Sequence, residues 1–316
     1  MESDTEDKFG DDPSSEPVAQ RALPDSYGIR PRDFRLPPDT RLGRVRLQVS
    51  DLGRSLAFYE SVLGLRALER DSSHVMLGAH DDAEPLVELN LRCGAKPAPP
   101  RGLLGLYHFA LLLPDRPSLG RFAQHLSDIN ARAGAADHLV SEALYLQDPD
   151  NLGIEVYSDR PRSTWIRAGR ELKMATDPLD FNDLLKSGGT AKWTGMPAGT
   201  AMGHVHLHVG DIAAASSFYS DALGFDRIVW AYPGALFMSA GGYHHHLGTN
   251  IWAGRGARPA GEGDAQLLEW NIRLRDSADV AGVAESLERS GYTIERDGGD
   301  VVTRDPWGTQ VRIGQR

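Results

Sequence analysis

Three histidines alternate with other residues in the stretch GHVHLHVGD, residues 203–211, and imidazoles can bind metal ions or transfer protons near neutral pH. Every second side chain of a β-strand lies on the same face, so His204, His206 and His208 are expected to point the same way. Same-face neighbours are about 6–7 Å apart, whereas metal–nitrogen bonds are about 2 Å long. The three imidazoles therefore cannot all bind the same ion.

The segment that carries these histidines repeats within the chain. Residues 43–64 align without a gap on residues 203–224 and share a Gly, alternating aliphatic residues, an Asp, a Phe-Tyr pair and a final Gly. Each copy is typical of a strand, an Asp that begins a helix, an amphipathic helix and a Gly that ends it. Looser copies begin at Tyr107 and Glu269, and short alternating strands follow each copy. We therefore predict an α+β fold of four βαβββ modules.

The modules also determine the expected domain organisation. A lone module would leave one apolar face of its sheet uncovered, so the four modules are expected to pair into two closed or half-closed barrels. The first domain, with modules one and two, is expected at residues 41–160, and the second, with modules three and four, at residues 196–316. Residues 161–195 carry no such pattern and are interpreted as a linker. Residues 1–40 are expected to form a disordered tail and an extended arm.

Composition narrows the setting of the protein. The formal charge of −10 at pH 7 argues against nucleic-acid binding. No apolar run approaches the roughly 20 residues of a membrane helix, and the acidic N-terminus lacks the features of a signal peptide. The single cysteine, Cys93, excludes an internal disulfide and fits a reducing cytoplasm. A homo-oligomer is also expected, with a dimer and a tetramer equally compatible with the sequence.

The four modules, each opening with strand, Asp, helix and Phe-Tyr, resemble the vicinal oxygen chelate superfamily. This superfamily includes glyoxalases, antibiotic-binding proteins and extradiol ring-cleaving dioxygenases, and its modules carry metal ligands on their first and last strands. The resemblance covers residues 40–316 apart from the linker. It implies a fold and leaves the reaction open, because one scaffold can host several chemistries.

The resemblance also implies a set of metal ligands. The family's first-strand ligand lies seven residues before the Asp that begins the helix, which gives His108 in module two and His204 in module three. The same position holds Arg44 in module one and Glu269 in module four. Only module two has a carboxylate at the last-strand position, Glu155; module four has an arginine, Arg312, there. Two histidines and one carboxylate form the facial triad that holds non-haem Fe(II).

The stretch from His138 to Glu155 resembles the extradiol dioxygenase signature. Its His, aliphatic-Tyr pair, Asp-Pro pair and Glu correspond to His138, Leu144-Tyr145, Asp148-Pro149 and Glu155, although Asn151 replaces the usual Gly or Pro. The resemblance implies an Fe(II) enzyme of the catechol 2,3-dioxygenase type, which opens a catecholic ring with O₂ to a 2-hydroxymuconic semialdehyde-type product. His138 is expected to transfer protons, and Tyr145 to orient a substrate oxygen.

A second histidine run, YHHHLGTN, begins the last strand of module three. Strand alternation places His244 and His246 on one face, where we expect acid–base or substrate contacts, and His245 on the other. Glu88, in the last strand of module one, is expected to pair with arginine in a degenerate second site. Other functions remain open: a hydroquinone ring-cleaving dioxygenase, a glyoxalase-like isomerase or a metal-free binding protein.

The distribution of the ligands predicts which modules share a barrel. If modules one and two formed one barrel, His108 and Glu155 would face Arg44, and no barrel would contain two histidines and the carboxylate. Metal ligands must lie in one coordination sphere, with bonds of about 2.0–2.2 Å. Module two is therefore expected to pack against module three, and module one against module four.

Overall fold

The computed structural model describes residues 19–23 and 25–316, and it contains the four predicted βαβββ modules. The first module consists of β2 (Arg41–Val49), α1 (Leu52–Ser61), β3 (Arg66–Arg70), β4 (His74–Gly78) and β5 (Pro85–Leu91). The second consists of β6 (Leu103–Leu112), α2 (Arg116–Asp128), β7 (Gly134–Asp137), β8 (Ser141–Gln147) and β9 (Gly153–Asp159). The order of elements is the same in both.

The third and fourth modules follow the same order. The third consists of β12 (Ala201–His208), α4 (Ile212–Ala215) continued by the π-helix η2 (Ser216–Ala222), β13 (Asp226–Val229), β14 (Ala235–Ser239) and β15 (Leu247–Asn250). The fourth consists of β17 (Gln266–Leu274), α5 (Ser277–Arg289), β18 (Ile294–Asp297), β19 (Asp300–Arg304) and β20 (Gln310–Gln315). A short strand, β16 (Arg258–Pro259), lies between them and pairs with β6.

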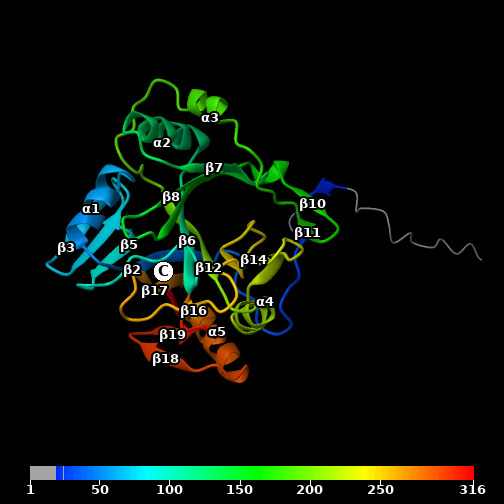
Figure 1. Ribbon diagram of the computed structural model, residues 1–316. Coiled ribbons are helices and arrows are strands. Elements are labelled where there is room, and N and C mark those ends of the chain that lie inside the picture. Colours follow the sequence, from blue (N-terminus) through cyan, green and yellow to red (C-terminus); the bar gives the residue numbers. More distant parts are fainter. Residues whose placement is uncertain (1–18, 24) are drawn as a thin grey trace, which may run out of the picture.

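Each large sheet is built from one module of the N-terminal half of the chain and one module of the C-terminal half. One sheet has the strand order β13-β14-β15-β12-β6-β9-β8-β7, and the other β18-β19-β20-β17-β2-β5-β4-β3. In both, the first strands of the two modules pair antiparallel in the middle. Figure 1 shows the helices α1, α2, α4 and α5 on the outside of the strands. The predicted fold is confirmed, as is the pairing of module two with three and one with four.

The start of each module helix has a local cause in the sequence. An aspartate precedes each helix, and its side chain accepts the backbone N–H three residues further on, which satisfies one of the free donors at the helix N-terminus. These aspartates are Asp51, Asp115, Asp211 and Asp276. At the other end of α1, Gly64 has a φ of 76°, a conformation that glycine adopts without strain.

The Phe-Tyr pairs connect the two sheets. Tyr59 is fully buried, and its hydroxyl donates to the Asp148 carboxylate in the turn before β9 at 3.3 Å. Tyr219 repeats this contact with Asp305 in the turn before β20 at 2.8 Å. The helices of modules one and three are therefore bonded to turns of modules two and four, which belong to the opposite sheets. One continuous hydrophobic core runs through all four modules.

The segment interpreted as a linker has a structure of its own. It contains η1 (Arg162–Thr164), β10 (Ile166–Ala168), β11 (Glu171–Leu172) and α3 (Phe181–Ser187). A further strand, β1 (Gln20–Arg21), pairs with β10, so this part of the expected disordered tail is ordered. Residues 1–18 and 24, also assigned to the tail, lie outside the described residues. Among the residues described, no helix is both long enough and apolar enough to cross a membrane.

Candidate metal centre

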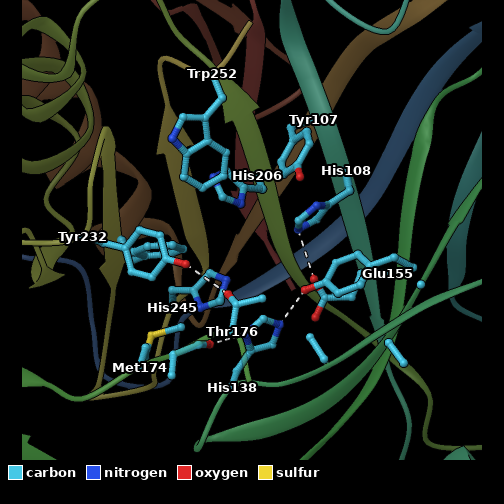
Figure 2. A pocket seen from close by; sticks show the side chains of 16 residues that line it. Tyr107, His108, His138, Glu155, Met174, Thr176, His206, Tyr232, His245 and Trp252 are labelled. Carbon is cyan, nitrogen blue, oxygen red and sulfur yellow. Dashed lines mark hydrogen bonds and ion pairs between the residues drawn. The ribbon is translucent and has the colours of Figure 1, made fainter. Parts of the chain in front are cut away.

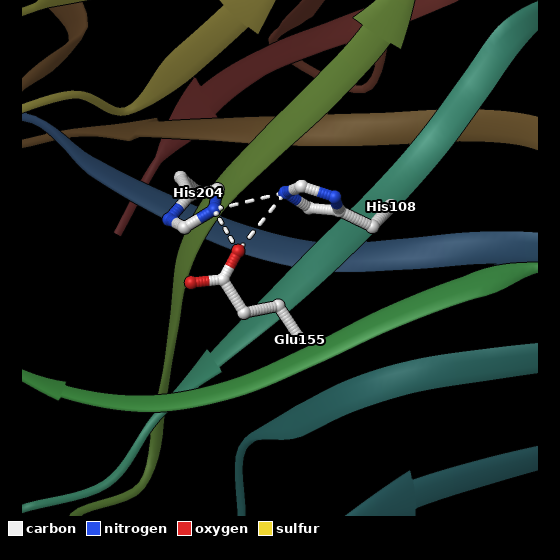
Figure 3. Close-up of side chains that lie close together, drawn as sticks. All are labelled: His108, Glu155 and His204. Atoms are coloured by element: carbon white, nitrogen blue, oxygen red, sulfur yellow. Dashed lines mark hydrogen bonds and ion pairs between the residues drawn. The ribbon is translucent and has the colours of Figure 1, made fainter. Parts of the chain in front are cut away.

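Three adjacent strands bring the predicted ligands to one point. His108 lies on β6, Glu155 on β9 and His204 on β12, and β6 is hydrogen-bonded to both neighbours. Glu155 Oε2 is 3.0 Å from the Nε2 atom of each histidine, and the two Nε2 atoms are 3.2 Å apart. Figure 3 shows the three side chains pointing toward one another from their separate strands. All three are buried.

The spacing of these three atoms fits a metal ion. Ligands at right angles around an ion with bonds of about 2.1 Å lie about 3.0 Å apart, close to the separations seen here. In addition, the Nδ1 atom of His204 is buried and has no hydrogen-bond partner among the residues that the structure describes, and its Nε2 atom contacts Glu155 and His108. Two imidazoles and a carboxylate are a donor set suited to Fe(II), with the remaining positions open.

The protonation states of the three residues also suit a metal. Burial alone would raise the pKa of the Glu155 carboxyl, but the adjacent His204 and His108 hold the pKa well below its usual range, so Glu155 is a carboxylate. Burial lowers the pKa of His108 and of His204. Neutral imidazoles and an ionised carboxylate are the forms that bind metals.

A cavity of about 310 Å³ opens beside His108 and Glu155. His138 and Tyr145 both line it, and the Tyr145 hydroxyl is 2.6 Å from His138 Nε2. The other ring nitrogen of His138, Nδ1, is 2.6 Å from the Ala175 carbonyl oxygen. Burial raises the pKa of the Tyr145 phenol well above its usual range, and the Glu155 carboxylate raises it further. The structure therefore brings His138 and Tyr145 together next to the predicted ligands, as Figure 2 shows for His138.

The second histidine run is placed differently from the expectation. His245 lines the cavity, whereas His244 and His246 do not. The alternation argument is wrong here because the run lies in the turn before β15 and not in the strand. His246 instead packs near Ser239 and Ala240, and burial lowers its pKa to about 3.

His244 does not line the cavity, but it contacts His245, which does. The Nε2 atom of His244 is 2.9 Å from Asp159 Oδ1, and its Nδ1 atom is 2.8 Å from His245 Nδ1. A carboxylate can only accept, so His244 carries its proton on Nε2 and His245 donates its Nδ1 proton to His244. The Nε2 atom of neutral His245 is then unprotonated. Burial among other histidines lowers the pKa of His245 well below its usual range.

Much of the cavity wall was not identified from the sequence. The unidentified part consists of aromatic side chains on several elements and residues of the supposed linker: Tyr107, Tyr232, Phe237, Trp252, Met174 and Thr176. Tyr107 adjoins the ligand His108, so its position gave some signal. Thr176 gave none, because its approach to Tyr232, at 3.0 Å between hydroxyls, depends on tertiary packing.

The equivalent position in the other sheet holds charge pairs. Glu88 is 2.7 Å from Arg44 and 2.8 Å from Arg46, and Glu269 is 3.1 Å from Arg312. The predicted pairing of Glu88 with arginine is confirmed. An arginine stays protonated and cannot bind a metal ion, so these residues form ion pairs where the first sheet has its three candidate ligands.

The fold and the three converging side chains define the class of protein. The chain belongs to the Glyoxalase/Bleomycin resistance protein/Dioxygenase superfamily, whose family model matches residues 41–156 and 201–313. Within this class it is similar to a catechol-2,3-dioxygenase of Bacillus subtilis (strain 168), with 44% identity over 272 residues that cover 85% of this chain and 94% of the relative. The resemblance inferred from the sequence is thereby confirmed.

Two solved structures share the fold. A proposed dioxygenase from Bacillus subtilis subsp. subtilis str. 168 superposes with a TM-score of 0.61 at 16% identity and covers 90% of this chain and 86% of its own. Glyoxalase I from Zea mays gives a TM-score of 0.50 at 18% identity, and the superposition covers 87% of this chain and 92% of the glyoxalase chain. At such identities the likeness concerns the fold alone.

Proposed function

We propose that the protein is an Fe(II)-dependent extradiol dioxygenase that opens a catecholic ring with O₂ to a 2-hydroxymuconic semialdehyde-type product. One observation carries the proposal: His108, Glu155 and His204 place their ligand atoms 3.0–3.2 Å apart at a cavity that His138 and Tyr145 also line. The 44% identity to a catechol-2,3-dioxygenase supports the same reaction.

The three ligands would hold Fe(II) and leave one side of it facing the cavity. Fe(II) bound there would supply adjacent positions for two substrate oxygens and O₂. The cavity wall suits a flat aromatic ring, because Phe237, Trp252 and Met174 contribute apolar surface to it.

His138 and Tyr145 form a proton-handling pair in this proposal. The Ala175 carbonyl can only accept, so His138 carries a proton on Nδ1, and Nε2 accepts the Tyr145 hydroxyl proton in a hydrogen bond. Tyr145 stays a neutral phenol, and because its proton is donated to His138, its oxygen can accept a hydrogen bond from a substrate hydroxyl. His138 Nε2 is the group that takes up a proton when a catechol hydroxyl ionises.

His245 is a second proton-handling residue that we add to the predicted set. Its unprotonated Nε2 takes no part in the bond to His244, and its ring centroid is 4.1 Å from that of the ligand His204. We propose that His245 exchanges a proton with the reacting oxygens, and that Asp159 and His244 act by fixing its tautomer.

Anaerobic reconstitution tests the proposal. The full chain is loaded with Fe(II), mixed with catechol without air and then exposed to O₂. We expect a yellow product near neutral pH, one O₂ consumed per ring and no product with Zn²⁺ in place of Fe(II). Accumulation of an intradiol product, or metal-independent catechol binding without oxygen uptake, would contradict the proposal. Mn²⁺ loading determines whether a second metal supports the reaction.

A further inference from the structure

The Asn250 side chain, at the end of β15, joins two histidines of β12. Its Nδ2 atom is 2.9 Å from His206 Nε2, and its Oδ1 atom is 2.6 Å from His208 Nδ1. The same Oδ1 atom accepts the backbone N–H of Trp252 at 2.9 Å. The three contacts together use both ends of the amide.

The backbone donor fixes the direction of every bond in this chain of contacts. A backbone N–H can only donate, so the Asn250 atom that faces Trp252 is the carbonyl oxygen and not the amide nitrogen. His208 must therefore donate from Nδ1 to the same oxygen. The amide nitrogen, which has only donors, must donate to His206 Nε2. His206 consequently carries its single proton on Nδ1.

The His206 ring is part of the cavity wall. It lines the cavity beside His108, with ring centroids 5.0 Å apart, and its Nδ1 atom makes no hydrogen bond to any residue that the structure describes. The labelled side chains of Figure 2 place His206 between Tyr107 and His245. The bonds of Asn250 thus fix the donor on Nδ1 before any ligand arrives.

A glycine makes room for this ring. His206 on β12 lies opposite Gly248 on β15. At the equivalent position of module two, Ala110 on β6 lies opposite Glu155 on β9. A Cβ atom on Gly248 would lie 2.8–3.0 Å from the His206 ring. Module two therefore has a small residue opposite a ligand carboxylate, whereas module three has an imidazole opposite a glycine. Strand alternation places His206 on the same face of β12 as His204, and Gly248 leaves room for its ring there.

We propose that His206 is a substrate-positioning residue, which donates its Nδ1–H to an oxygen of the bound aromatic diol, and that Asn250 and His208 hold it in that tautomer. The proposal rests on the proposed function for the identity of the ligand. It assigns to His206 a fixed donor role, distinct from proton transfer, because protonation of Nε2 would oppose the N–H of Asn250.

Two substitutions at His206 distinguish the effect of its N–H donor from the effect of its bulk. His206→Asn keeps an N–H near the position of Nδ1, whereas His206→Leu keeps the bulk and removes the donor. Catechol affinity is measured for the anaerobic Fe(II)-loaded full chain, together with iron content and melting temperature. We expect His206→Leu to bind catechol roughly 10-fold to 100-fold more weakly, the loss typical of one hydrogen bond to a charged oxygen, and His206→Asn to stay within about 3-fold of the parent.

Histidine ¹⁵N NMR of the metal-free protein gives an independent readout. The His206 signals, assigned by their loss in His206→Asn, are expected to show a protonated Nδ1 and an unprotonated Nε2. A proton on Nε2, equal catechol affinity in His206→Leu and the parent, or equal losses in both variants would overturn the proposal. If the parent binds catechol with these differences but does not open the ring, the proposed reaction fails and the role of His206 stands.

Discussion

The Glu155 carboxylate is the only negative charge among the three ligand side chains, and it lies 3.0 Å from both histidine nitrogens. Glu155→Gln keeps the shape and removes the charge that helps to hold Fe(II). We expect iron content after anaerobic reconstitution to fall and catechol turnover to be lost. Glu262→Gln, at an exposed carboxylate, is the control and should match the parent. Full activity of Glu155→Gln would remove Glu155 from the metal centre.

Replacement of His138 is expected to lower the rate and leave the metal in place, because His138 lines the cavity and is hydrogen-bonded to Tyr145 and not to a ligand residue. His138→Phe should retain iron and lose about 10²–10⁴-fold in kcat, as for a proton-transfer residue. Tyr145→Phe should lower kcat as well, and the double variant should be less impaired than the product of the two losses, because the residues share one hydrogen bond. Loss of iron in His138→Phe would instead make His138 a ligand.

Asp148 gives the protein a pH-dependent stability. Burial raises the pKa of Asp148 to about 6, above the usual value of 3.8, so the folded chain binds more protons than the unfolded chain between these values. The stabilising contribution is therefore complete below pH 3.8 and is lost as the pH rises through about 6. Asp148→Asn lacks this dependence.

Urea unfolding of the parent and of Asp148→Asn at pH 5 and pH 7 measures this effect. The parent should lose roughly 1 kcal/mol of unfolding free energy relative to the variant between the two pH values, given the shift of about two pKa units. A constant difference between the two proteins would show that Asp148 ionises with an ordinary pKa.

At the scale of elements, the close approach of β9 to β6 sets the distance from Glu155 to His108. Gly153 begins β9, and a Cβ atom there would lie 2.0 Å from the Tyr107 carbonyl oxygen, a backbone atom that cannot rotate away. Gly153→Ala should therefore push the strands apart, lower the unfolding free energy by about 1–3 kcal/mol and reduce iron content. The matched control is Gly263→Ala, where nothing lies within 4 Å. Parental iron content in Gly153→Ala would show that the ligands tolerate this displacement.

The elements also explain which parts of the site could be predicted. His108, Glu155 and His204 lie in regular strands, so the spacing implied by the resemblance to the superfamily could be applied to them. A count back from the helix-capping aspartates gave the two histidines, and alignment of the last strands of modules two and four gave Glu155. The alternation argument failed at His245 because a turn has no fixed two-residue period. The hydrogen bonds that Asn250 donates to His206 and that His138 donates to the Ala175 carbonyl join residues far apart in sequence, and no local pattern encodes them.

At the scale of the whole molecule, the pairing of modules followed from chemistry and not from sequence order. Arginines at the ligand positions of modules one and four left only one combination with two histidines and a carboxylate, and the strand order of both sheets confirms it. The contribution of residues 174–176 to the cavity wall was not predictable, because a segment without periodicity gives no indication of where it packs.

The same pairing predicts how the chain behaves when it is divided. A break between Gly189 and Thr190, after α3, separates His108 and Glu155 from His204, and it leaves β6 and β2 without their antiparallel partners β12 and β17. Each fragment would expose a long unpaired strand edge and half of a shared core. We expect neither fragment alone to retain iron after gel filtration, and co-expressed fragments to associate and recover it, as measured by iron content and circular dichroism. Parental iron binding by residues 1–189 alone would mean that His204 is not needed for the metal centre, and the proposed triad would then be wrong.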